Sequence, residues 1–243
     1  MKRRLDELLL ARQLCNDIKE ARALIMAGRV LIDERVEDKP GMSFAERANI
    51  RIKTKKSPYV SRGGLKLEKA FDTFHLDVHD KVCMDAGCST GGFTHLLLAR
   101  GARKVYAVDV GSGQLDWRLR NDERVVVMER TNVRYLTPSD LPDPPRFLCA
   151  DLSFISLKTV LPVFARLLPP GGEAVVLIKP QFEAARDEVA SGGIVHSEIV
   201  RQRTVDEVLA AAEAAGFMSV GVTTSPIKGA KGNVEYPALL KRV

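Results

Sequence analysis

The sequence has no long apolar run. None of its hydrophobic stretches approaches the roughly 18 residues that a membrane-spanning helix requires. The opening stretch MKRRLDELLLARQLC is interrupted by acids, and no small-residue cleavage site follows it. We therefore expect this stretch to form the first helix of the mature protein. We expect the protein to be cytoplasmic, with no membrane as a partner.

Cysteine and histidine are too few and too scattered to make a metal site. The four cysteines form no C-x-x-C pair, and the four histidines show no spacing typical of ligands. Zinc and a disulfide framework are both disfavoured, and a reducing cytoplasm fits this cysteine usage. We therefore predict that the protein holds no metal. The cysteines are Cys15, Cys83, Cys88 and Cys149.

The excess positive charge is concentrated in the first quarter of the chain. Residues 1–60 contain 14 Lys or Arg against 9 Asp or Glu, a net charge of +5 out of +6 for the whole chain. The remaining three quarters are therefore close to neutral, at +1. A segment of +5 fits either a solvated, slightly basic surface or an electrostatic contact with a polyanion.

The first quarter has the pattern of a helix pair followed by a hairpin. Leucines repeat at helical spacing from Leu5, and a second helical pattern begins at Asp17, a suitable N-cap, and stops at Gly28. The apolar run 30–32 and the polar turn after it predict a short hairpin. Residues 49–56 alternate apolar and basic side chains, as an exposed strand does.

This quarter also resembles a known RNA-binding module. The strings RLDELLLARQL and EARALIMAGRVLID, within about residues 3–50, resemble the S4 domain. The resemblance implies a small α+β module whose basic face binds structured RNA. We expect this domain to occupy residues 1–56, followed by a linker at 57–60. The basic residues expected to contact RNA are Arg3, Arg4, Arg12, Lys19, Arg22, Arg29, Lys55 and Lys56.

In the rest of the chain, apolar strand patterns alternate with helical patterns. The apolar segments KVCMDAG, KVYAVDV, RVVVMER, RFLCADL and EAVVLIK are typical of buried strands. Such alternation predicts a parallel sheet covered by helices on both faces, with the ligand at the carboxyl ends of the strands. The expected helices lie near 93–100, 114–121, 157–168 and 197–215, and two further strands lie near 217–224 and 233–240.

The stretch DAGCSTGG, residues 85–92, is a glycine-rich turn between a predicted strand and a predicted helix. A nicotinamide site would show G-x-G-x-x-G, whose second glycine lets the backbone approach a pyrophosphate. Here Asp85 would repel a pyrophosphate, but it suits the sulfonium and amino group of S-adenosylmethionine. Asp109, at the end of the second strand, suits a ribose in either kind of site. The turn therefore favours a class I methyltransferase, with an NAD-linked oxidoreductase as the alternative.

Residues 60–243 resemble the catalytic domain of the TlyA (haemolysin A-like) rRNA methyltransferases, which is of the FtsJ/RrmJ type. The strings VSRGGLKL, DAGCSTGGFT, AVDVGSGQL, RTNVR, ADLSFISL, LIKPQFE and SPIKGAKGNVEY carry the resemblance. An S4 domain in front of this core is the family's arrangement. The resemblance implies an α/β fold, a Rossmann-like seven-stranded sheet over 61–243, and S-adenosylmethionine as cofactor. Nothing in the sequence suits the membrane lysis that the haemolysin name implies.

The family's targets are cytidine riboses in ribosomal RNA. Some members modify both ribosomal subunits, and others, shorter at both ends, modify the large one alone. This chain begins almost directly with its first S4 helix and stops at Val243, right after its last predicted strand. We therefore expect an enzyme that methylates the 2′-hydroxyl of a cytidine in 23S rRNA of the large subunit. We also expect the enzyme to be a monomer.

The resemblance places four catalytic residues at Lys66, Asp151, Lys179 and Glu235. A ribose 2′-hydroxyl is a poor nucleophile, and a lysine with a lowered pKa can accept its proton. We assign Lys179 as this base and Lys66 as a second cation, with the two carboxylates holding the ammonium groups. Because the carboxylates also raise lysine pKa values, the alternative is that Lys179 only orients the hydroxyl. No metal is required, since the donor sulfur leaves as a neutral thioether.

The cofactor is expected to lie against the glycine-rich turn. We expect the backbone of the turn to pass under the methionine part, Asp109 to bind the ribose hydroxyls, and Asn132 to offer its amide to adenine. Gly192 and Gly193 predict a mobile loop beside the site. The candidate cofactor residues are Asp85, Gly87, Ser89, Gly91, Gly92, Phe93, Asp109 and Asn132.

One alternative function uses the same two domains without chemistry. A catalytically inactive, S4-containing protein would bind ribosomal RNA as an assembly factor. All four catalytic positions and the acid of the glycine-rich turn are present, which argues against a decayed site. Methyl transfer to ribosomal subunits separates the two hypotheses.

Overall fold

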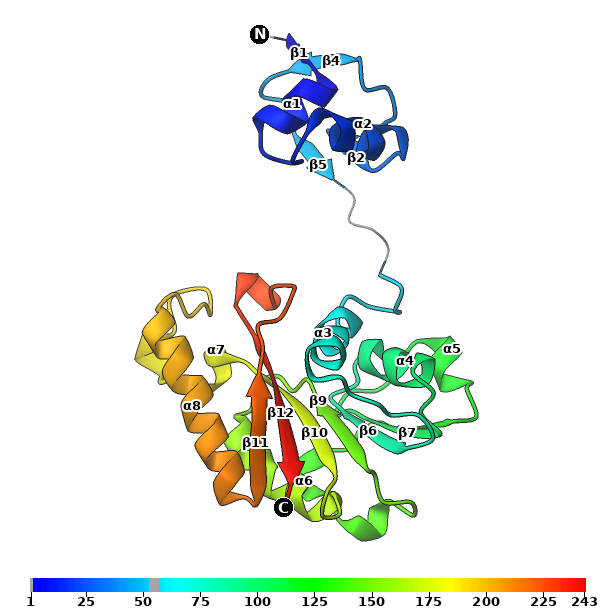
Figure 1. Cartoon of the computed structure of the whole chain (residues 1–243), viewed down its shortest axis with the longest axis vertical. Helices are drawn as coiled ribbons and strands as arrows, with labels where there is room; N and C mark the ends of the chain where they lie inside the picture. The colour runs from blue at the N-terminus through cyan, green and yellow to red at the C-terminus, as the bar shows by residue number, and fades with distance from the viewer. Residues whose placement is uncertain (1, 53–56) are drawn as a thin grey trace. The chain divides into compact units, whose positions relative to one another are not determined.

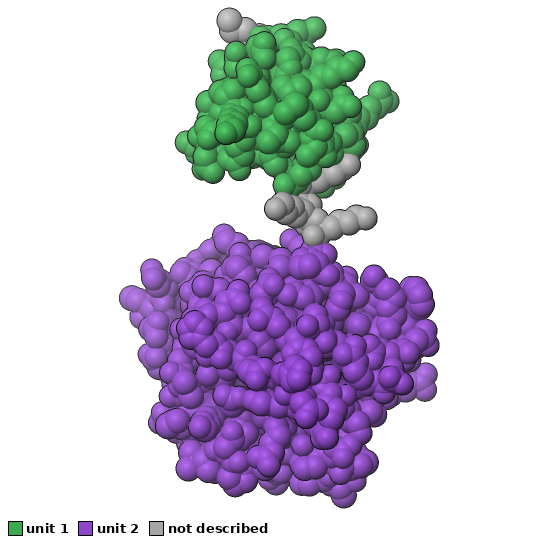
Figure 2. All heavy atoms as spheres, turned by 45° about the vertical axis from the view of Figure 1, so that its right-hand side comes forward, with its two compact units in different colours: residues 1–56 green, residues 57–243 purple. Residues whose placement is uncertain are grey.

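The chain folds into two compact units, Met1–Lys56 and Ser57–Val243, coloured separately in Figure 2. The computed structural model describes residues 2–52 and 57–243. Each unit is described by itself. Of the RNA-contact candidates, Lys55 and Lys56 lie outside the described residues, as does the second half of the strand expected at 49–56.

The N-terminal unit contains the predicted helix pair and hairpin. Asp17 caps the second helix by accepting a hydrogen bond from the backbone N–H of Glu20 at 2.7 Å, and Gly28 ends it with a φ of +62°. The structure also pairs β1 with β4. The sequence did not predict this pairing, because each strand has only three residues and no alternation of apolar and polar side chains. The elements are β1 (Lys2–Arg4), α1 (Leu5–Ala11), α2 (Ile18–Met26), β2 (Val30–Ile32), β3 (Arg35–Glu37), β4 (Ser43–Ala45) and β5 (Ile50–Ile52).

The core of this unit is small and aliphatic. Strands β3, β2 and β5 form an antiparallel sheet in that order, and the two helices pack on each other. Apolar residues of α1 and α2 that repeat at helical spacing form the buried face of each helix. The two helices could therefore be predicted from the sequence. The buried cluster consists of Leu5, Leu9, Ala21, Ile25, Val30 and Ile32.

The second unit is a seven-stranded sheet with helices on both faces (Figure 1). The strand order is β11-β12-β10-β9-β6-β7-β8, in which β10, β9, β6, β7 and β8 are parallel. The strands are β6 (Val82–Ala86), β7 (Lys104–Val108), β8 (Val125–Met128), β9 (Phe147–Ala150), β10 (Glu173–Ile178), β11 (Phe217–Val222) and β12 (Tyr236–Arg242).

The structure adds two features to the sheet predicted from the sequence, which left the direction of the last two strands open. Strand β12 lies between β10 and β11 and is antiparallel to both, because the connection from β11 to β12 carries no crossover helix. Strand β8 is only partly buried because it is the edge of the sheet, and Val126 is 37% exposed.

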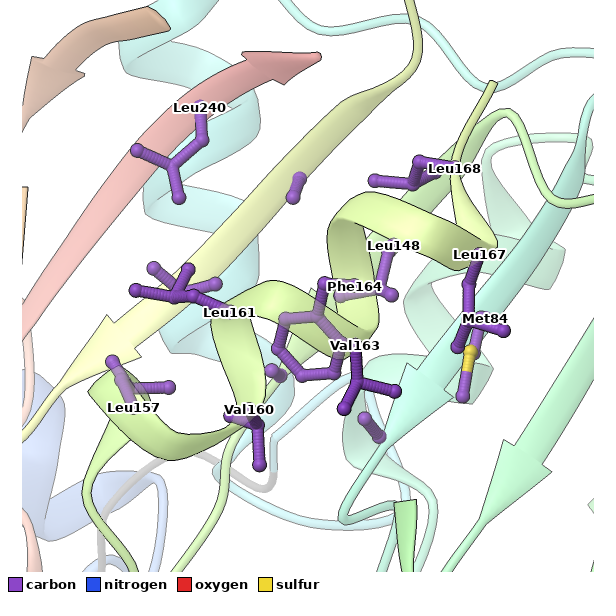
Figure 3. Packing of buried hydrophobic residues seen from close by; sticks show 14 of the residues in the cluster. Met84, Leu148, Leu157, Val160, Leu161, Val163, Phe164, Leu167, Leu168 and Leu240 are labelled. Atoms are coloured by element: carbon purple, nitrogen blue, oxygen red, sulfur yellow. The ribbon is translucent and has the colours of Figure 1, made fainter. Parts of the chain in front are cut away.

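The helices divide between the two faces of the sheet. Helices α6 and α8 cover one face, where Phe164 and Leu161 pack with Leu148 of β9 and Met84 of β6 (Figure 3). Helices α3 and α4 cover the other face of the sheet. There Leu67 and other apolar side chains of these helices pack on the strand residues that point to this face, which alternate along each strand with those that face α6 and α8. The helices are α3 (Gly64–Phe74), α4 (Gly92–Ala99), α5 (Trp117–Arg120), α6 (Leu157–Leu167), α7 (Pro180–Glu183) and α8 (Glu198–Ala214), with 3₁₀ turns η1 (Val133–Tyr135), η2 (Pro138–Asp140), η3 (Arg186–Glu188) and η4 (Ala230–Gly232).

The segment expected to be a linker belongs to the second unit. Tyr59 and Val60 pack against the core under α3 and α4, and the Val60 N–H donates to His95 Nδ1 at 3.1 Å. The Tyr59 hydroxyl donates to Glu68 at 2.6 Å. Tyr59 and Val60, which follow Pro58, therefore contact the core of the second unit. The turn-like composition of residues 57–60 did not indicate these contacts. Within the described residues, no helix is both long and apolar enough to cross a bilayer.

Candidate active site

Two adjoining hollows open at the carboxyl edge of the parallel strands. The larger, about 510 Å³, is lined by residues that follow β7, β8 and β9, among them Asp109, Asn132 and Asp151. The smaller, about 120 Å³, lies between the glycine-rich turn and the start of α3, and Asp85 and Phe93 line it. Gly87, Ser89 and Asp151 line both hollows. The sequence prediction that a ligand site forms at this edge therefore corresponds to real cavities.

The four candidate catalytic residues come together as a chain of alternating charge. Lys179 Nζ lies 2.5 Å from Asp151 Oδ1, and Lys66 Nζ lies 3.3 Å from Asp151 Oδ2. Lys66 Nζ also lies 2.7 Å from Glu235 Oε2. Three of the four residues come from the ends of β9, β10 and β12 and the fourth from α3, although they are separated by up to 169 positions in sequence.

Burial makes these contacts strong. The side chains of Lys66, Lys179 and Glu235 are 11%, 7% and 2% exposed. Burial acts to lower the pKa of Lys66, but the two carboxylates beside it outweigh burial and raise the pKa. Burial acts to raise the pKa of Asp151, but the two ammonium groups lower it overall. The cluster is therefore a set of mutually stabilised charges, of which Asp151 lines the larger hollow.

A close backbone approach fixes Glu235. A Cβ on Gly229 would lie 1.8 Å from Glu235 Oε1, so only glycine fits at this position of the loop between β11 and β12. The Ser225 N–H donates to the carbonyl of Glu235 at 2.9 Å, and the Gly229 N–H donates to the carbonyl of Asn233 at 2.9 Å. The string SPIKGAKGNVEY thus folds into a loop that presents one carboxylate to Lys66.

The loop after β9 carries two contacts that sequence reasoning missed. Ser153 Oγ lies 3.2 Å from Lys179 Nζ, a second oxygen on the candidate base. Phe154 is 91% exposed, has a φ of +62°, lines the larger hollow, and packs on Phe182 with ring centroids 5.3 Å apart. A bulky residue in the left-handed region is strained, and such strain is found at functional sites. The available signal was its place three residues after Asp151.

Glu183 clamps that loop to the segment after Lys179. Its carboxylate accepts hydrogen bonds from Ser156 Oγ at 2.6 Å and from the Leu157 N–H at 2.7 Å, at the start of α6. Burial raises the pKa of Glu183 against the lowering effect of these two donors. The loop that holds Asp151 and Phe154 is therefore fixed at both ends.

Asp85 is buried beneath the smaller hollow. One carboxylate oxygen, Oδ2, accepts from the Thr94 N–H at 2.9 Å and from Thr94 Oγ1 at 2.7 Å. Burial raises the pKa of Asp85 to about 7 in spite of these donors. The other oxygen, Oδ1, is buried and has no hydrogen-bond partner among the described residues. The acid that favoured a cationic ligand thus lines the smaller hollow and has one carboxylate oxygen without a partner.

The glycines of the turn are required for different reasons. Gly87 has a φ of +82°, and a Cβ there would lie 2.7 Å from the carbonyl oxygen of Asp151. Gly91 has a φ of +93° and lies against Leu115 and Leu119. Gly91 does not line either hollow, in contrast with the expectation that it lies under the cofactor. Gly92 lines the smaller hollow.

Asp109 and Asn132 line the larger hollow and also organise its walls. Asp109 accepts from the Ser89 N–H at 2.8 Å and from the Gly111 N–H at 2.7 Å, so it ties the turn to the end of β7. Asn132 Oδ1 accepts from the Arg134 N–H at 3.1 Å, which leaves its amide nitrogen as the group that would face a ligand.

The loop expected to be mobile is tethered. Asn233 is 3% exposed, accepts from the Val195 N–H at 3.1 Å and donates to the Gly193 carbonyl at 2.7 Å. Ala190 and Ile194 form a bridge across the loop. The Gly192-Gly193 pair therefore serves a turn held against the segment that carries Glu235.

Several RNA-contact candidates in the N-terminal unit have partners within the unit. Arg4 and Arg22 both bind Asp6, at 2.9 and 3.0 Å. Arg3 pairs with Glu46 at 3.3 Å, and Arg12 donates to the backbone carbonyls of Ala48 and Glu46. Lys19 is exposed, and Arg29, which is partly buried, also has an interaction partner. The basic face is thus partly occupied by structural ion pairs, which the charge count could not separate from free charge.

The fold and site together define the class of protein. The arrangement matches solved S-adenosylmethionine-dependent methyltransferases, such as one from Mesorhizobium loti with a TM-score of 0.55, 16% identity, and coverage of 72% of this chain and 96% of that one. At this identity the likeness concerns the fold alone. The protein has a methyltransferase fold.

The family follows from closer matches. The family model described as FtsJ-like methyltransferase matches residues 59–242, and the S4 domain model matches residues 3–44. The chain belongs to the FtsJ-like methyltransferase family, in the TlyA group that carries an S4 domain in front. The resemblance stated from the sequence is confirmed, and so are the α/β methyltransferase fold with an S4 domain and the assignment as an enzyme.

Three relatives illustrate the similarity. The 16S/23S rRNA (cytidine-2'-O)-methyltransferase TlyA of Mycobacterium tuberculosis is 46% identical over 96% of this chain and 87% of its own length. Hemolysin A of Brachyspira hyodysenteriae is 41% identical over 97% and 98%. The solved structure of a "putative hemolysin" from Streptococcus thermophilus has a TM-score of 0.78 and 43% identity, and the match covers 100% of this chain and 89% of that one.

Proposed function

We propose that this protein transfers a methyl group from S-adenosylmethionine to the ribose 2′-hydroxyl of a cytidine in ribosomal RNA, with 23S rRNA of the large subunit as the target. The observation that carries the proposal is the chain Glu235–Lys66–Asp151–Lys179, whose member Asp151 lines a ligand-sized hollow. The printed functions of two relatives support it. One is the M. tuberculosis protein, and the other is the 23S rRNA (cytidine-2'-O)-methyltransferase TlyA of Campylobacter jejuni, 34% identical over 73% of this chain and 69% of its own length.

The donor suits the two hollows. A cavity of about 510 Å³ is within the range of small-molecule sites, and its polar groups, Asp109 and Asn132, suit a ribose and an adenine. Gly87 and Ser89 would hold the methionine part by their backbone, and Asp85 Oδ1 would accept from its ammonium group in the smaller hollow. When bound, S-adenosylmethionine supplies a methyl group on a cationic sulfur as the electrophile.

Lys179 is the residue that we assign to the hydroxyl proton. Its Nζ is held between Asp151 Oδ1 and Ser153 Oγ, so its position relative to the hollow is fixed before the substrate arrives. The cluster holds Lys179 as an ammonium group, so it can accept the hydroxyl proton only after it has released its own proton to solvent. Fixed positioning and proton acceptance then both favour transfer. Lys66, held by Asp151 and Glu235, places a second positive charge beside the oxygen as it develops negative charge. The alternative, in which Lys179 only orients the hydroxyl, keeps the same geometry.

Phe154 suits the base of the target nucleotide. Its exposed ring is supported by Phe182, whose own ring lies 5.7 Å from Lys179 Nζ. A ribose within a stacked A-form helix is poorly aligned for in-line attack, so the nucleotide must be extruded, and extruded bases stack on aromatic side chains. In this proposal the extruded base stacks on the exposed ring of Phe154 while its ribose reaches Lys179.

The S4 unit supplies most of the electrostatic attraction to RNA in this account. Residues 1–60 carry a net charge of +5 out of the chain's +6. Contacts with phosphates release counterions, so binding of the whole chain should weaken steeply as salt increases. The fragment Ser57–Val243, which keeps Tyr59 and Val60 on their core, should bind the donor and bind ribosomal subunits weakly.

The test is methyl transfer from labelled donor to isolated, unmodified ribosomal subunits. The proposal expects label in 23S rRNA of the large subunit and little in 16S rRNA. Equal labelling of both RNAs would contradict the choice of subunit but leave the chemistry intact. Donor binding and subunit binding without any transfer would favour the inactive assembly factor.

A further inference from the structure

We propose that Asp85 releases a proton when the methyl donor binds, so that this buried carboxyl group couples donor affinity to pH. The inference rests on the proposed function, because it concerns how the smaller hollow accepts the cationic end of the same ligand.

Only one of the two carboxylate oxygens of Asp85 has hydrogen-bond partners among the described residues. Asp85 is 0% exposed, and Thr94 binds one of its oxygens through both its N–H and its hydroxyl. The second oxygen has no hydrogen-bond partner among the described residues, and the residue lines the hollow of about 120 Å³. Burying a carboxylate oxygen without a partner costs free energy. A hydrogen-bond donor or a positive charge placed beside this oxygen would therefore be stabilising.

The groups around Asp85 do not supply that charge. Thr94 faces it from α4, the thiol of Cys149 from β9, the thiol of Cys88 from the glycine-rich turn, and Asp151 from the loop after β9. Among the described residues, no basic side chain forms an ion pair with Asp85. The two nearby lysines are held by Asp151 and Glu235.

The empty protein therefore favours the neutral acid. Burial raises the pKa of Asp85 to about 7 against the lowering effect of hydrogen bonds from Thr94 and of the thiol of Cys149, and the negative charge of Asp151 also raises it. At pH 6.5 most molecules without ligand carry a proton on this group.

A cation in the hollow reverses this preference. An ammonium group beside the free oxygen favours the carboxylate, and the proton passes to solvent. The balance is Asp85–COOH plus cationic ligand giving the Asp85–COO⁻ complex plus H⁺. Because the complex holds fewer protons than the free protein, donor affinity rises with pH as the pH passes through about 7. Above that range the ligand's own α-amino group, with a pKa of about 8, loses its charge and the gain ends.

Calorimetry of S-adenosylmethionine binding to the full chain tests the coupling. At pH 6.5, in two buffers of different ionisation enthalpy, we expect release of about 0.7 proton per donor bound. 5′-Methylthioadenosine, which has neither the sulfonium nor the amino acid, should bind without release. Binding of S-adenosylmethionine without a buffer effect, or equal release on binding 5′-methylthioadenosine, would overturn the inference.

A matched pair of variants assigns the proton to Asp85. D85N keeps the shape of the side chain and removes the titration, so it should bind without proton release and without gaining affinity between pH 6.0 and 7.5. The native chain should gain about fivefold over that interval. D116N is the control. Arg118 lowers the pKa of Asp116 to about 2, so this group is already ionised at pH 6.5 and its substitution should leave the proton release unchanged. Proton release of native size in D85N would overturn the assignment.

A second readout does not depend on the variant. Infrared difference spectra of the native chain should lose a protonated-carboxyl C=O band when the donor is added at pH 6.5, and unchanged carboxyl bands would overturn the inference. Donor binding without this change contradicts the coupling alone. Absence of donor binding at every pH contradicts the proposed function instead.

Discussion

Asp6 and Asp151 are each shared by two basic side chains, as is the surface residue Glu207. Asp6 in the N-terminal unit binds Arg4 and Arg22 at 2.9 and 3.0 Å, and Asp151 in the second unit binds Lys179 and Lys66 at 2.5 and 3.3 Å. In both, the pKa of the carboxyl group is lowered. By charge and distance alone the two clusters are alike.

They differ in the kind of cation and in what surrounds it. The arginines on Asp6 are 46% and 52% exposed, whereas the lysines on Asp151 are 11% and 7% exposed, and Asp151 itself lines the larger hollow. Arginine stays protonated in proteins, whereas a buried lysine can exchange a proton. A shared carboxylate at the surface and one beside a cavity therefore differ in which molecules can reach them, although their ion pairs are alike.

The largest expected effect comes from replacing Lys179. K179A should lower the rate of methyl transfer by about 10²–10⁴-fold while donor affinity changes by no more than a few-fold. K179R separates the roles of the residue, since it keeps the charge but cannot accept a proton. We expect K179R to be as inactive as K179A in single-turnover assays.

The control for this pair is K158A, which removes a surface lysine that pairs with Glu207 at 2.9 Å, outside both hollows. It should leave transfer unchanged. Substantial activity in K179R with none in K179A would assign Lys179 to orientation. Full activity in both would remove it from the mechanism.

A smaller effect is expected on donor affinity from Asp109. D109A removes a carboxylate that lines the larger hollow and holds the Ser89 N–H and the Gly111 N–H. Loss of a charged hydrogen bond should weaken donor binding by about 1.5–3 kcal/mol. Calorimetric titration checks it, and an unchanged dissociation constant would mean that the ribose is held elsewhere.

In the Asp6 cluster, substitution should change stability and not chemistry. D6N should lower the local stability of the N-terminal unit by about 1–2 kcal/mol, reduced by the exposure of both arginines. Hydrogen exchange in the full chain should then quicken in α1 and α2, and the rate of transfer at saturating RNA should be unchanged. E7Q is the matched control, since Glu7 is 54% exposed and 3.8 Å from Arg4. An effect of E7Q as large as that of D6N would contradict the cluster's role.

The same cluster predicts the direction of acid sensitivity. Hydrogen bonds and charge from Arg4 lead in holding the pKa of Asp6 at about 2, below the value of about 4 for an unfolded chain. The stabilisation is therefore present above about pH 4 and is lost as the pH falls toward 2. In hydrogen exchange of α1, the difference between the native chain and D6N should shrink over that interval. A constant difference would mean that the ionised form of Asp6 is not what stabilises the unit.

The positions of two candidate catalytic residues could be predicted from the strand pattern. Asp151 and Lys179 directly follow buried apolar strands, and parallel strands bring their carboxyl ends to one edge. Lys66 and Glu235 lacked such a pattern and were placed by family resemblance. The structure brings all four within contact, while their roles stay predictions.

What the sequence did not reveal depends on loop conformation and distant pairing. The position of Phe154 follows from a left-handed backbone that no periodicity encodes. Asn233 tethers a turn 40 positions away, and Arg22 finds Asp6 16 positions away. A count of charges does not reveal which arginines pair with acids inside the unit, and the role of these arginines in RNA contact stays a prediction.

The measurement that tests the central claim most directly is nucleoside analysis of methylated ribosomal RNA. Large subunits treated with the native chain and S-adenosylmethionine should yield 2′-O-methylcytidine on complete digestion, and K179A should yield none. A methyl group on a base, or on no nucleoside at all, would contradict the account of the Lys66–Asp151–Lys179–Glu235 cluster as a ribose methylation site.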